Sequence, residues 1–558
     1  MSLVTVEYFL AQSYATTSQG SYTVESNVVN TINYTGQGVN IAVVDIGFDV
    51  NNTDISPNIV NYTSFRFDNN IAHGNIDHGT KVAEIILDVA PDANLYLYNY
   101  AGTTSFVNMV DHIIDRGDID VISMSLSRFG PVGPFNGTSE TSLKVKDARD
   151  NGIIWVNSAG NYAERHWNGT FTSLDSDRWH DFATDETIDI TANTNSLIRL
   201  QLTWDDPWGS SNNNYDLYLF NSTIDLVASS TTVQSGTQNP IETISYNVTS
   251  SPGTYHVAIY NSSATISNEL ELFSIGVHKL DQQNQVKSSS ITIPADSQGA
   301  ITVGAVNYNT ELLKDYSSQG PTNDGRLKPD VVGPTDVITS IGSFSGTSAA
   351  APHVAGVSAL IKQAYPYYTA DQIQEKLELT TKDYNVKNNQ NGTGLINAVN
   401  AMPFAFSDTF ESDLSKWTEI NELDWNIEGE AELDVPDHGT SNNVAHVDNC
   451  DTYCILQSTV IDLSDYVDAQ LSFWRFIDNS VDADEYLKVE ISNDNGTNWN
   501  EVFHWTNDTG NDDTWYHETH SLDSSYLTGN FVVQFNASAS SFVEDIEIDD
   551  VIISGTYL

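Results

Sequence analysis

The chain has 558 residues, which is too long for one compact domain. Asp and Glu number 75 against 22 Lys and Arg, so the formal net charge is -53 and nucleic acid or anionic membranes are not expected as partners. Hydrophobic residues make up 39% and can fill several cores, but no uninterrupted apolar run reaches membrane-spanning length, which argues against membrane insertion.

The acidic composition fits a secreted or extracellular protein, and a saline or calcium-containing exterior would favour it. Asn-x-Ser/Thr triplets recur along the chain and permit glycosylation. Residues 1–27 lack the basic and apolar segments of a signal peptide. We therefore expect an N-terminal extension at 1–27 on a mature form from which a signal and a pro-segment have been removed.

Residues 28–165 alternate strand-like with helix-like stretches. Apolar runs of strand length followed by amphipathic segments predict crossover units and a parallel sheet covered on both faces. The expected strands are 41–45, 93–100, 120–127 and 152–160, and the expected helices are 78–90, 106–117 and 139–152.

This pattern breaks after Asn161. Residues 166–280 read as β-strands separated by Ser, Asn, Gly and Pro turns. Strand and helix patterns then return over 281–402, with a strand at 301–306 and a helix at 370–381. We expect an α/β domain interrupted by an all-β sandwich insertion, whose two ends must lie close together.

Residues 403–558 are again β-like and very acidic. Alternating strands joined by tight turns such as Asn495-Gly496 predict a third domain, a further sandwich or jelly roll. Both cysteines of the chain, Cys450 and Cys454, lie here. They are too few for a disulfide framework, and a small-loop disulfide is expected in preference to a two-thiol metal site.

Peptide-bond hydrolysis needs an activated nucleophile, a base and donors for the oxyanion, and candidates occur in the order Asp, His, Ser. Asp45 ends the strand 41–45, at the carboxyl edge of the expected sheet, where open α/β sheets bind ligands. His78 directly precedes an apolar helical pattern, with Gly79 leaving room beside it. Taken alone, Asp45 also fits an acidic turn residue, and His78 fits a structural or exposed histidine.

Ser348 has the strongest signal. It lies in a string of small residues at 345–356 that opens a helix, whose start supplies a free N–H and a positive dipole end beside the hydroxyl. Asn161 follows an apolar strand, and its amide can donate to an oxyanion together with the Ser348 N–H. The alternative for Asn161 is an ordinary turn residue. His353 is expected to pack structurally.

These segments, in this order, resemble the subtilase (subtilisin-like) family of serine peptidases. The supporting motifs are GTSAAAPHVAG at 346–356, which is highly specific, HGT at 78–80, SAGN at 158–161 and LKPDVVGP at 327–334. The resemblance covers about 28–165 and 285–402.

The resemblance implies a subtilisin-like three-layer α/β domain with a seven-stranded parallel sheet and a broad cleft for an extended substrate strand. It implies a serine endopeptidase acting on proteins or peptides through the triad Asp45, His78 and Ser348, with Asn161 as oxyanion donor and no cofactor for catalysis. A monomer is expected. Two segments match those that line the primary pocket and pair with substrate backbone: Ser125, Leu126 and Ser127, and Ser158, Ala159 and Gly160.

The sequence departs from the family pattern at three places. Ile46 replaces a hydroxyl residue that often helps to hold the aspartate, so other donors are expected to compensate. Ser127 stands where glycine is usual and is expected to narrow the mouth of the pocket. The insertion after Asn161 replaces a loop that helps to set specificity.

The two β regions have weaker resemblances. Parts of the insertion, at 214–220, 226–230 and 252–260, resemble the bacterial pre-peptidase C-terminal (PPC) domain. The start and the end of the tail resemble MAM-type jelly rolls, in which the first and last strands are neighbours. Four tail carboxylates can therefore converge on a structural Ca²⁺, although simple surface acidity explains them equally well: Asp408, Glu411, Asp549 and Asp550.

Three functions are open. The leading one is a secreted endopeptidase whose β domains bind substrate or surfaces. The second is a catalytically weak or inactive cell-surface binding protein on a subtilase scaffold, against which the presence of all four catalytic residues argues. The third is a processing enzyme with narrow specificity.

Overall fold

The computed structural model describes residues 17–182, 185–249, 252–382, 385–411, 413–421, 425–429, 443–447, 450–478, 480–482, 485–506, 513–541 and 544–555. The chain divides into two compact units. One contains the chain up to Val24 together with Thr35–Ile396, and the other contains Glu25–Tyr34 together with the chain from Asn397 onward.

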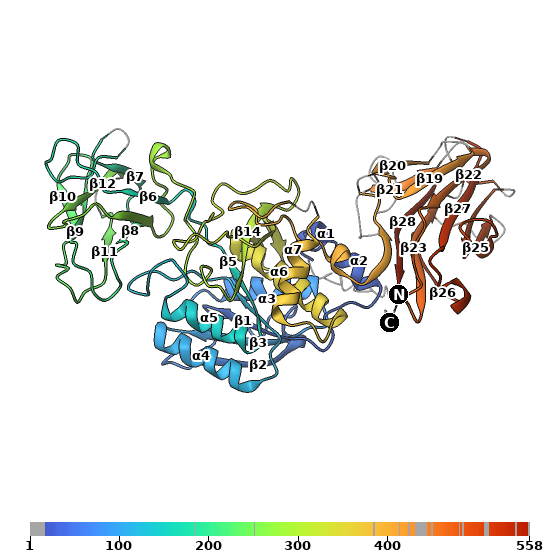
Figure 1. Ribbon diagram of the computed structural model, residues 1–558, viewed down its shortest axis with the longest axis horizontal. Helices are drawn as coiled ribbons and strands as arrows, with labels where there is room; N and C mark the ends of the chain where they lie inside the picture. The colour runs from blue at the N-terminus through green and yellow to red at the C-terminus, as the bar shows by residue number, and fades with distance from the viewer. Residues whose placement is uncertain are drawn as a thin grey trace, which may run out of the picture. The chain divides into compact units, whose positions relative to one another are not determined.

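A seven-stranded parallel sheet is the centre of the first unit (Figure 1). In spatial order its strands are β15 (Val331–Thr335), β14 (Ala300–Asn307), β5 (Ile154–Ser158), β4 (Val121–Met124), β1 (Asn40–Asp45), β3 (Asn94–Tyr100) and β2 (Ile59–Phe65). This confirms the expected sheet. The sequence missed β2, an edge strand with little burial.

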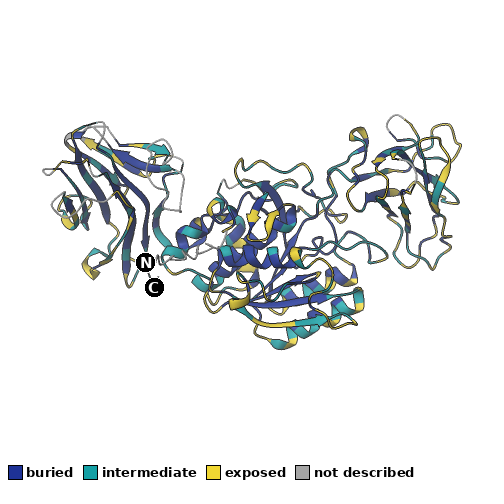
Figure 2. Cartoon of the chain, turned by 180° about the vertical axis from the view of Figure 1, so that it is seen from behind, coloured by how far each residue is buried: buried dark blue, intermediate teal, exposed yellow. Residues whose placement is uncertain are grey.

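Helices cover both faces of this sheet. The longer ones are α3 (Ile76–Val89), α4 (Thr103–Arg116), α5 (Glu140–Asp150), α6 (Thr347–Ala364) and α7 (Ala370–Leu379), and α1 (Gly20–Thr23) is a single turn. The faces of α4 and α5 that cover Val44 and Trp155 form one buried core. On the other face α3 and α6 pack closely, because a Cβ on Gly356 would lie 2.6 Å from the Cβ of Val89. Figure 2 shows α6 buried over most of its length.

The chain leaves this domain after β5 and forms a sandwich of two four-stranded antiparallel sheets, which confirms the all-β insertion. One sheet has the order β11 (Ile241–Asn247), β8 (Leu197–Trp204), β13 (Glu269–Ser274) and β6 (His166–Thr170). The other has the order β10 (Leu226–Ser230), β9 (Tyr215–Phe220), β12 (Gly253–Asn261) and β7 (Ile188–Ala192). Alternating side chains from both sheets fill one core.

The hairpin β16 (Val337–Thr339) and β17 (Gly342–Phe344) precedes α6 in the first unit. Its tip is exposed, but Phe344 at its end is buried. Single 3₁₀ turns occur at Ser56–Asn58, Gln282–Asn284 and Ser524–Tyr526.

The second unit is a pair of antiparallel sheets with the short helices α2 (Ser26–Thr31) and α8 (Ala398–Ala401). One sheet contains β20 (Trp425–Gly429), β21 (Asn443–Val447), β28 (Ile546–Ser554), β23 (Ala469–Ile477) and β26 (Tyr516–Leu522), with β18 (Phe404–Asp408) paired to β28. The other has the order β19 (Trp417–Asn421), β22 (Cys450–Ser458), β27 (Val532–Ala539), β24 (Tyr486–Ser492) and β25 (Asn500–Thr506).

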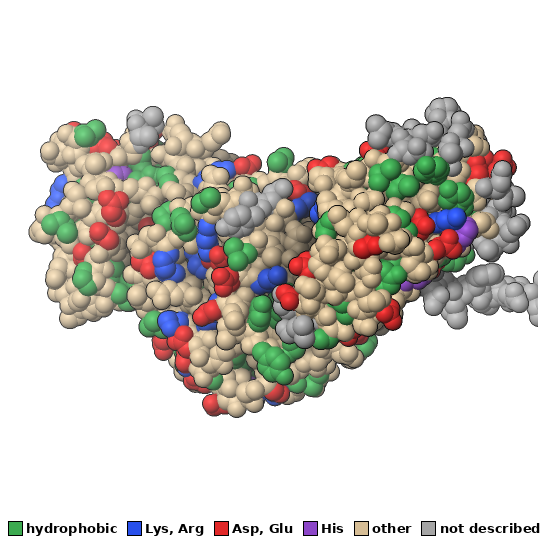
Figure 3. Space-filling view, turned by 45° about the vertical axis from the view of Figure 1, so that its right-hand side comes forward, with side chains coloured by type: hydrophobic (Ala, Val, Ile, Leu, Met, Phe, Trp, Pro, Cys, Tyr) green, Lys and Arg blue, Asp and Glu red, His purple; other side chains and the backbone are tan. Residues whose placement is uncertain are grey.

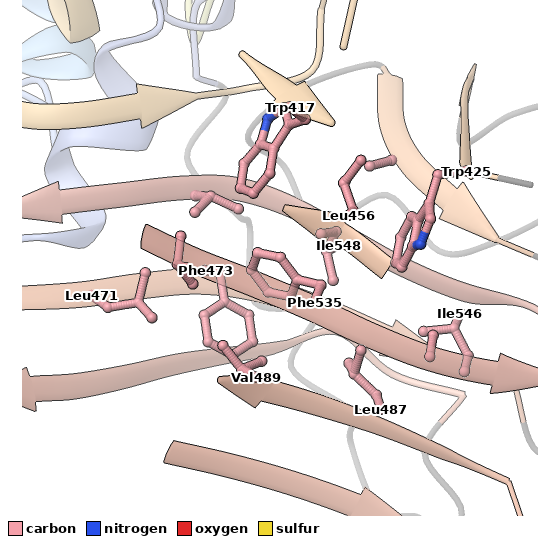
Figure 4. Packing of buried hydrophobic residues seen from close by; sticks show 14 of the residues in the cluster. Trp417, Trp425, Leu456, Leu471, Phe473, Leu487, Val489, Phe535, Ile546 and Ile548 are labelled. Atoms are coloured by element: carbon pink, nitrogen blue, oxygen red, sulfur yellow. The ribbon is translucent and has the colours of Figure 1, made fainter. Parts of the chain in front are cut away.

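Aromatic and aliphatic side chains from both sheets of the second unit interdigitate, and Figure 4 shows Trp417, Phe473 and Phe535 among them. A disulfide joins Cys450 to Cys454, as expected. The first and last strands of this unit are neighbours, with Asp408 opposite Val551.

Acidic side chains are spread over the face seen in Figure 3 and do not form a single patch. The described chain contains no helix whose length and apolar character would let it cross a membrane.

Candidate active site

Asp45 and His78 form a hydrogen-bonded pair at the carboxyl edge of the sheet. Asp45 is the last residue of β1 and is fully buried, whereas His78 lies in the first turn of α3 and is partly exposed. The His78 Nδ1 lies 2.8 Å and 2.9 Å from the two carboxylate oxygens of Asp45. Because Nδ1 donates to Asp45, Nε2 is the ring nitrogen left to accept a proton.

Neighbouring backbone fixes the carboxylate of Asp45. The Ile46 N–H donates to its Oδ1 at 2.7 Å, so a backbone donor replaces the hydroxyl expected at position 46. A Cβ on Gly79 would lie 2.9 Å from the Cβ of Asp45, and therefore only glycine lets the start of α3 approach β1 so closely. Asn99 pairs with Asp45 on the adjacent strand β3 and donates to the carbonyl oxygen of Ile46 at 3.2 Å.

The surroundings of His78 favour its charged form. Burial lowers the pKa of His78, but the negative charge of Asp45 and the hydrogen bond to it outweigh burial and the nearby Lys81, so the pKa lies above its ordinary value. Phe344 packs edge-on against the imidazole with ring centroids 5.2 Å apart. A protonated imidazole is thus stabilised at this position, and Phe344 restricts the space into which the ring can rotate.

Ser348 lies in the first turn of α6, beside the end of β4. Its hydroxyl donates to the carbonyl oxygen of Ser125 at 3.1 Å, and the Ser125 hydroxyl donates to the carbonyl oxygen of Ser348 at 3.0 Å. Among the hydrogen bonds of the described residues, none joins Ser348 to His78.

Asn161 is oriented by the residue before Ser348. Its Oδ1 accepts from the backbone N–H and the hydroxyl of Thr347, at 2.9 Å and 3.1 Å. A Cβ on Gly346 would lie 3.0 Å from the Asn161 Nδ2, so the glycine provides space for the amide. With its oxygen occupied, Asn161 has the Nδ2 group available as a donor near the start of α6.

The segment Ser125–Ser127 follows β4 and is not paired with a neighbouring strand. The sequence predicted a strand up to 127, but β4 ends at Met124, because neither neighbouring strand pairs with the residues that follow. In the described chain, the backbone groups of Leu126 and Ser127 have no hydrogen-bond partner. Such an edge can accept a further extended strand.

The segment Ser158–Gly160 is engaged within the protein. The Ala159 N–H donates to Val303, and its carbonyl oxygen accepts from the N–H of Thr292. The Gly160 N–H donates to the hydroxyl of Thr347. This segment can therefore line a pocket, but its backbone is not free to pair with a strand.

Thr292 links the two segments. Its hydroxyl lies 2.7 Å from the hydroxyl of Ser127 and donates to the carbonyl oxygen of Ala159 at 3.2 Å. A Cβ on Gly160 would lie 2.9 Å from the methyl carbon of Thr292. Ser127 therefore does more than occupy space: it takes part in a hydroxyl bridge across the space between the segments.

His353 has the structural role expected from its place in the helix. It is fully buried, its Nδ1 donates to the carbonyl oxygen of Ala349 at 2.8 Å, and its Nε2 lies 3.0 Å from the hydroxyl of Ser18. Burial lowers the pKa of His353 to about 4.

Three of the four carboxylates expected to bind Ca²⁺ have other hydrogen-bond partners. Asp408 accepts from the indole N–H of Trp417 at 2.8 Å, and Glu411 accepts from the N–H of Asn443 at 2.9 Å. Asp549 accepts from the N–H of Asp550. In the part of the chain that the structure describes, the groups of His, Asp and Glu whose ligand atoms lie within 4.8 Å of one another are His446, Asp545 and Glu547, and Asp175, Asp177 and Glu186. The Ca²⁺ site at the four predicted residues remains a prediction.

Sequence reasoning missed several residues of this site. Thr347 lies in the motif at 346–356, but the motif does not show that its hydroxyl orients Asn161. Thr292 has no motif of its own, and Phe344 reaches His78 through a hairpin. Asn99 could have been found, because it is a polar residue at the carboxyl end of an apolar strand next to Asp45. The others depend on packing between distant segments.

Known proteins share this architecture. A model of the Subtilase family of peptidases matches residues 36–237 and 215–395. The minor extracellular protease Vpr of Bacillus subtilis is 25% identical over 436 residues, covering 66% of this chain and 52% of Vpr. The serine protease AprX of the same organism is 34% identical over 143 residues, covering 21% of this chain and 32% of AprX. The chain thus spans about half the length of Vpr and a third of that of AprX.

The fold has a counterpart among solved structures. The CspB protease of Clostridium perfringens aligns with a TM-score of 0.51 at 18% identity, covering 69% of this chain and 98% of that one. The family match extends from β1 to the region after α7 and includes Asp45, His78 and Ser348. The chain belongs to the subtilase family.

Proposed function

We propose that this protein is a serine endopeptidase that hydrolyses peptide bonds through an acyl-enzyme. The observation that carries the proposal is the buried Asp45 carboxylate held against His78 Nδ1, at the sheet edge where α6 presents Ser348. Membership of the subtilase family supports the same reaction.

Catalysis begins when the Ser348 side chain turns from the Ser125 carbonyl toward His78 Nε2, a hydrogen bond that often tightens only with substrate bound. His78 then accepts the hydroxyl proton as Ser348 Oγ attacks the scissile carbonyl, and Asp45 stabilises the imidazolium. The Asn161 Nδ2 and the Ser348 N–H donate to the developing oxyanion. His78 next protonates the leaving amine, and water releases the acyl group by the reverse sequence.

The substrate lies as an extended strand along Ser125–Ser127, whose open backbone supports this assignment. Ser158, Ala159 and Gly160 line the pocket next to it. The hydroxyl bridge from Ser127 to Thr292 crosses this region and reduces the space in the pocket. We therefore expect a small side chain on the substrate residue whose carbonyl is attacked.

The accessory domains serve binding and protection in this proposal. The insertion corresponds to a PPC-like sandwich and the second unit to a MAM-like jelly roll, with Ca²⁺ at Asp408, Glu411, Asp549 and Asp550 as the structural ion. The name of Vpr describes an extracellular protease. We propose secretion for this chain as well, and we propose that it acts as a monomer.

Covalent labelling tests the proposed reaction. A phosphonofluoridate should attach one adduct to Ser348 in the full chain and abolish casein cleavage, and Ser348→Ala should show neither labelling nor cleavage. A folded parent chain that is not labelled would contradict the proposal. If such a chain still bound glycans or proteins, it would instead be a binding protein on a subtilase scaffold.

A further inference from the structure

The inserted sandwich buries the outer face of the sheet β11-β8-β13-β6. Side chains pointing inward from this sheet, such as Leu202 and Leu272, belong to the core of the sandwich. The side chains that alternate with them point outward but are buried too: His166, Gln201, Thr203, Glu271 and Phe273. A sandwich tethered only by its two linkers would expose this face, so the burial marks an interface with the α/β domain.

Phe273 contacts both segments that flank Ser348. Its ring centroid lies 5.2 Å from that of Phe129, which follows the segment Ser125–Ser127. It lies 5.9 Å from that of Tyr162, the residue directly after Asn161. Phe129 and Tyr162 also pack against each other, with centroids 4.8 Å apart. One fully buried ring from the insertion thus packs against the continuations of the substrate segment and of the oxyanion segment.

Gln201 is the direct neighbour of Phe273 across the sheet. Its Oε1 accepts the N–H of Gly130 at 2.6 Å, and Gln201 itself is fully buried. Two residues before Gly130, the Arg128 N–H donates to the carbonyl oxygen of Ile293 at 2.8 Å. The chain that leaves Ser127 is therefore fixed at two successive points, one by the α/β domain and one by the insertion.

Glu271 adds a third contact on the same face. It accepts from the side-chain amide of Asn323 at 3.0 Å, and the backbone N–H of Asn323 donates to the carbonyl oxygen of Phe135 at 3.0 Å. Phe135 in turn packs on Phe273 with centroids 5.0 Å apart. The loop from 128 to 135 is held along its length by residues of this face.

We propose that the insertion acts as a brace that holds Ser125–Ser127 in the extended form that pairs with substrate, with Gln201 and Phe273 as positioning residues. This inference rests on the proposed peptidase function. A strand that is already ordered loses less conformational entropy when substrate pairs with it, so the brace strengthens binding of peptides that span the strand. It does not act on the bond-breaking groups.

The test compares Gln201→Met, which keeps size but removes the acceptor, and Phe273→Leu with the parent. Leu219→Ala is the matched control, because Leu219 is a fully buried core residue of the opposite sheet. Each full-length protein is assayed with a peptide long enough to span residues 125–127 and with a small amino-acid ester. We expect the KM for the peptide to rise about five- to tenfold in both brace variants, the size of one lost hydrogen bond. Turnover of the ester should stay within twofold of the parent, and the pH profile of that turnover should not shift.

The outcomes separate the possibilities. An unchanged peptide KM in Gln201→Met and Phe273→Leu, or an equal rise in Leu219→Ala, would overturn the brace. Hydrogen exchange of the 126–132 segment gives a readout without activity: the Gly130 amide should exchange faster in Gln201→Met than in the parent, and equal rates would also refute the brace. A parent that cleaves neither substrate and is not labelled at Ser348 would refute the peptidase function, while the exchange would still decide the brace.

Discussion

Helices α3 and α6 contribute to two sites that each contain a histidine and an aspartate. The pKa of the histidine is raised at one site and lowered at the other. At their N-terminal ends, His78 has the Asp45 carboxylate as partner, and its pKa is raised. Farther along the same pair, His353 and Asp88 are joined by Ser18, whose N–H donates to Asp88 at 2.8 Å and whose hydroxyl contacts His353. There burial lowers the pKa of His353 to about 4 and raises that of Asp88 to about 7.

The comparison shows which feature of the surroundings sets the protonation state of each histidine. Direct contact with a carboxylate makes a histidine ready to take up a proton, whereas burial without an opposite charge favours the uncharged form of a histidine and of a carboxyl; for Asp88 the negative charges of Glu84 and Asp54 add to the effect of burial. The first site suits chemistry and the second suits anchoring of the N-terminal segment. Substitutions at the two sites should therefore separate activity from stability.

Asp45→Asn should have the largest effect. The amide keeps the shape of the side chain but favours the wrong His78 tautomer and cannot stabilise the imidazolium, so we expect kcat to fall about 10⁴-fold. Thermal stability should change little by comparison. Active-site labelling and steady-state kinetics measure the effect. Asp88→Asn is the control and should keep full activity; a loss there, or activity retained in Asp45→Asn, would break the distinction between the sites.

His353→Leu should alter stability and its dependence on acid. At pH 7.5 the variant leaves the Ser18 hydroxyl without its partner at His353, and we expect a loss of about 1–3 kcal/mol. In the parent the unfolded chain protonates this histidine below about pH 6.5 while the folded chain resists to about pH 4, so stability falls as the pH falls through that window, by up to about 3 kcal/mol.

The variant should lack this decline. Urea unfolding of the first unit in a Ser348→Ala background, which prevents self-cleavage, measures it at pH 7.5 and pH 4.5. The same acid dependence with and without His353 would show that other groups cause it.

The sequence was sufficient to predict a parallel α/β domain, an all-β insertion and a β tail, because strand and helix periods are local features. It could not show that the chain leaves the sheet after Met124, because that depends on where neighbouring strands end. The pairing of Ser18 with His353 and the buried face around Phe273 are long-range packing, which no local pattern of residues encodes.

Asp88→Asn should stabilise the protein at alkaline pH. The folded chain holds a proton on Asp88 up to about pH 7, whereas the unfolded chain loses it near pH 4, so this group makes stability fall as the pH rises between those values. Asn keeps the oxygen that accepts the Ser18 N–H, and we expect a gain of about 1–2 kcal/mol at pH 8.5 and almost none at pH 4. Asp92→Asn, at an exposed position of the following turn, is the control. Equal melting temperatures of Asp88→Asn and parent at pH 8.5 would contradict the assignment.

Lys81→Met should produce the smallest effect, at the first site. The Lys81 ammonium donates to the carbonyl oxygen of Ser343 at 3.0 Å and lowers the pKa of His78 through its charge. Because catalysis needs the neutral imidazole, the acid limb of kcat/KM follows that pKa, and removing the cation should move the limb to higher pH by a few tenths of a unit. Lys146→Met on α5 should not move it. Adding salt should shrink the difference between parent and Lys81→Met, since screening weakens a charge that is partly exposed. An acid limb that moves to lower pH, or a shift that does not depend on salt, would mean that Lys81 acts on His78 through packing and not through its charge.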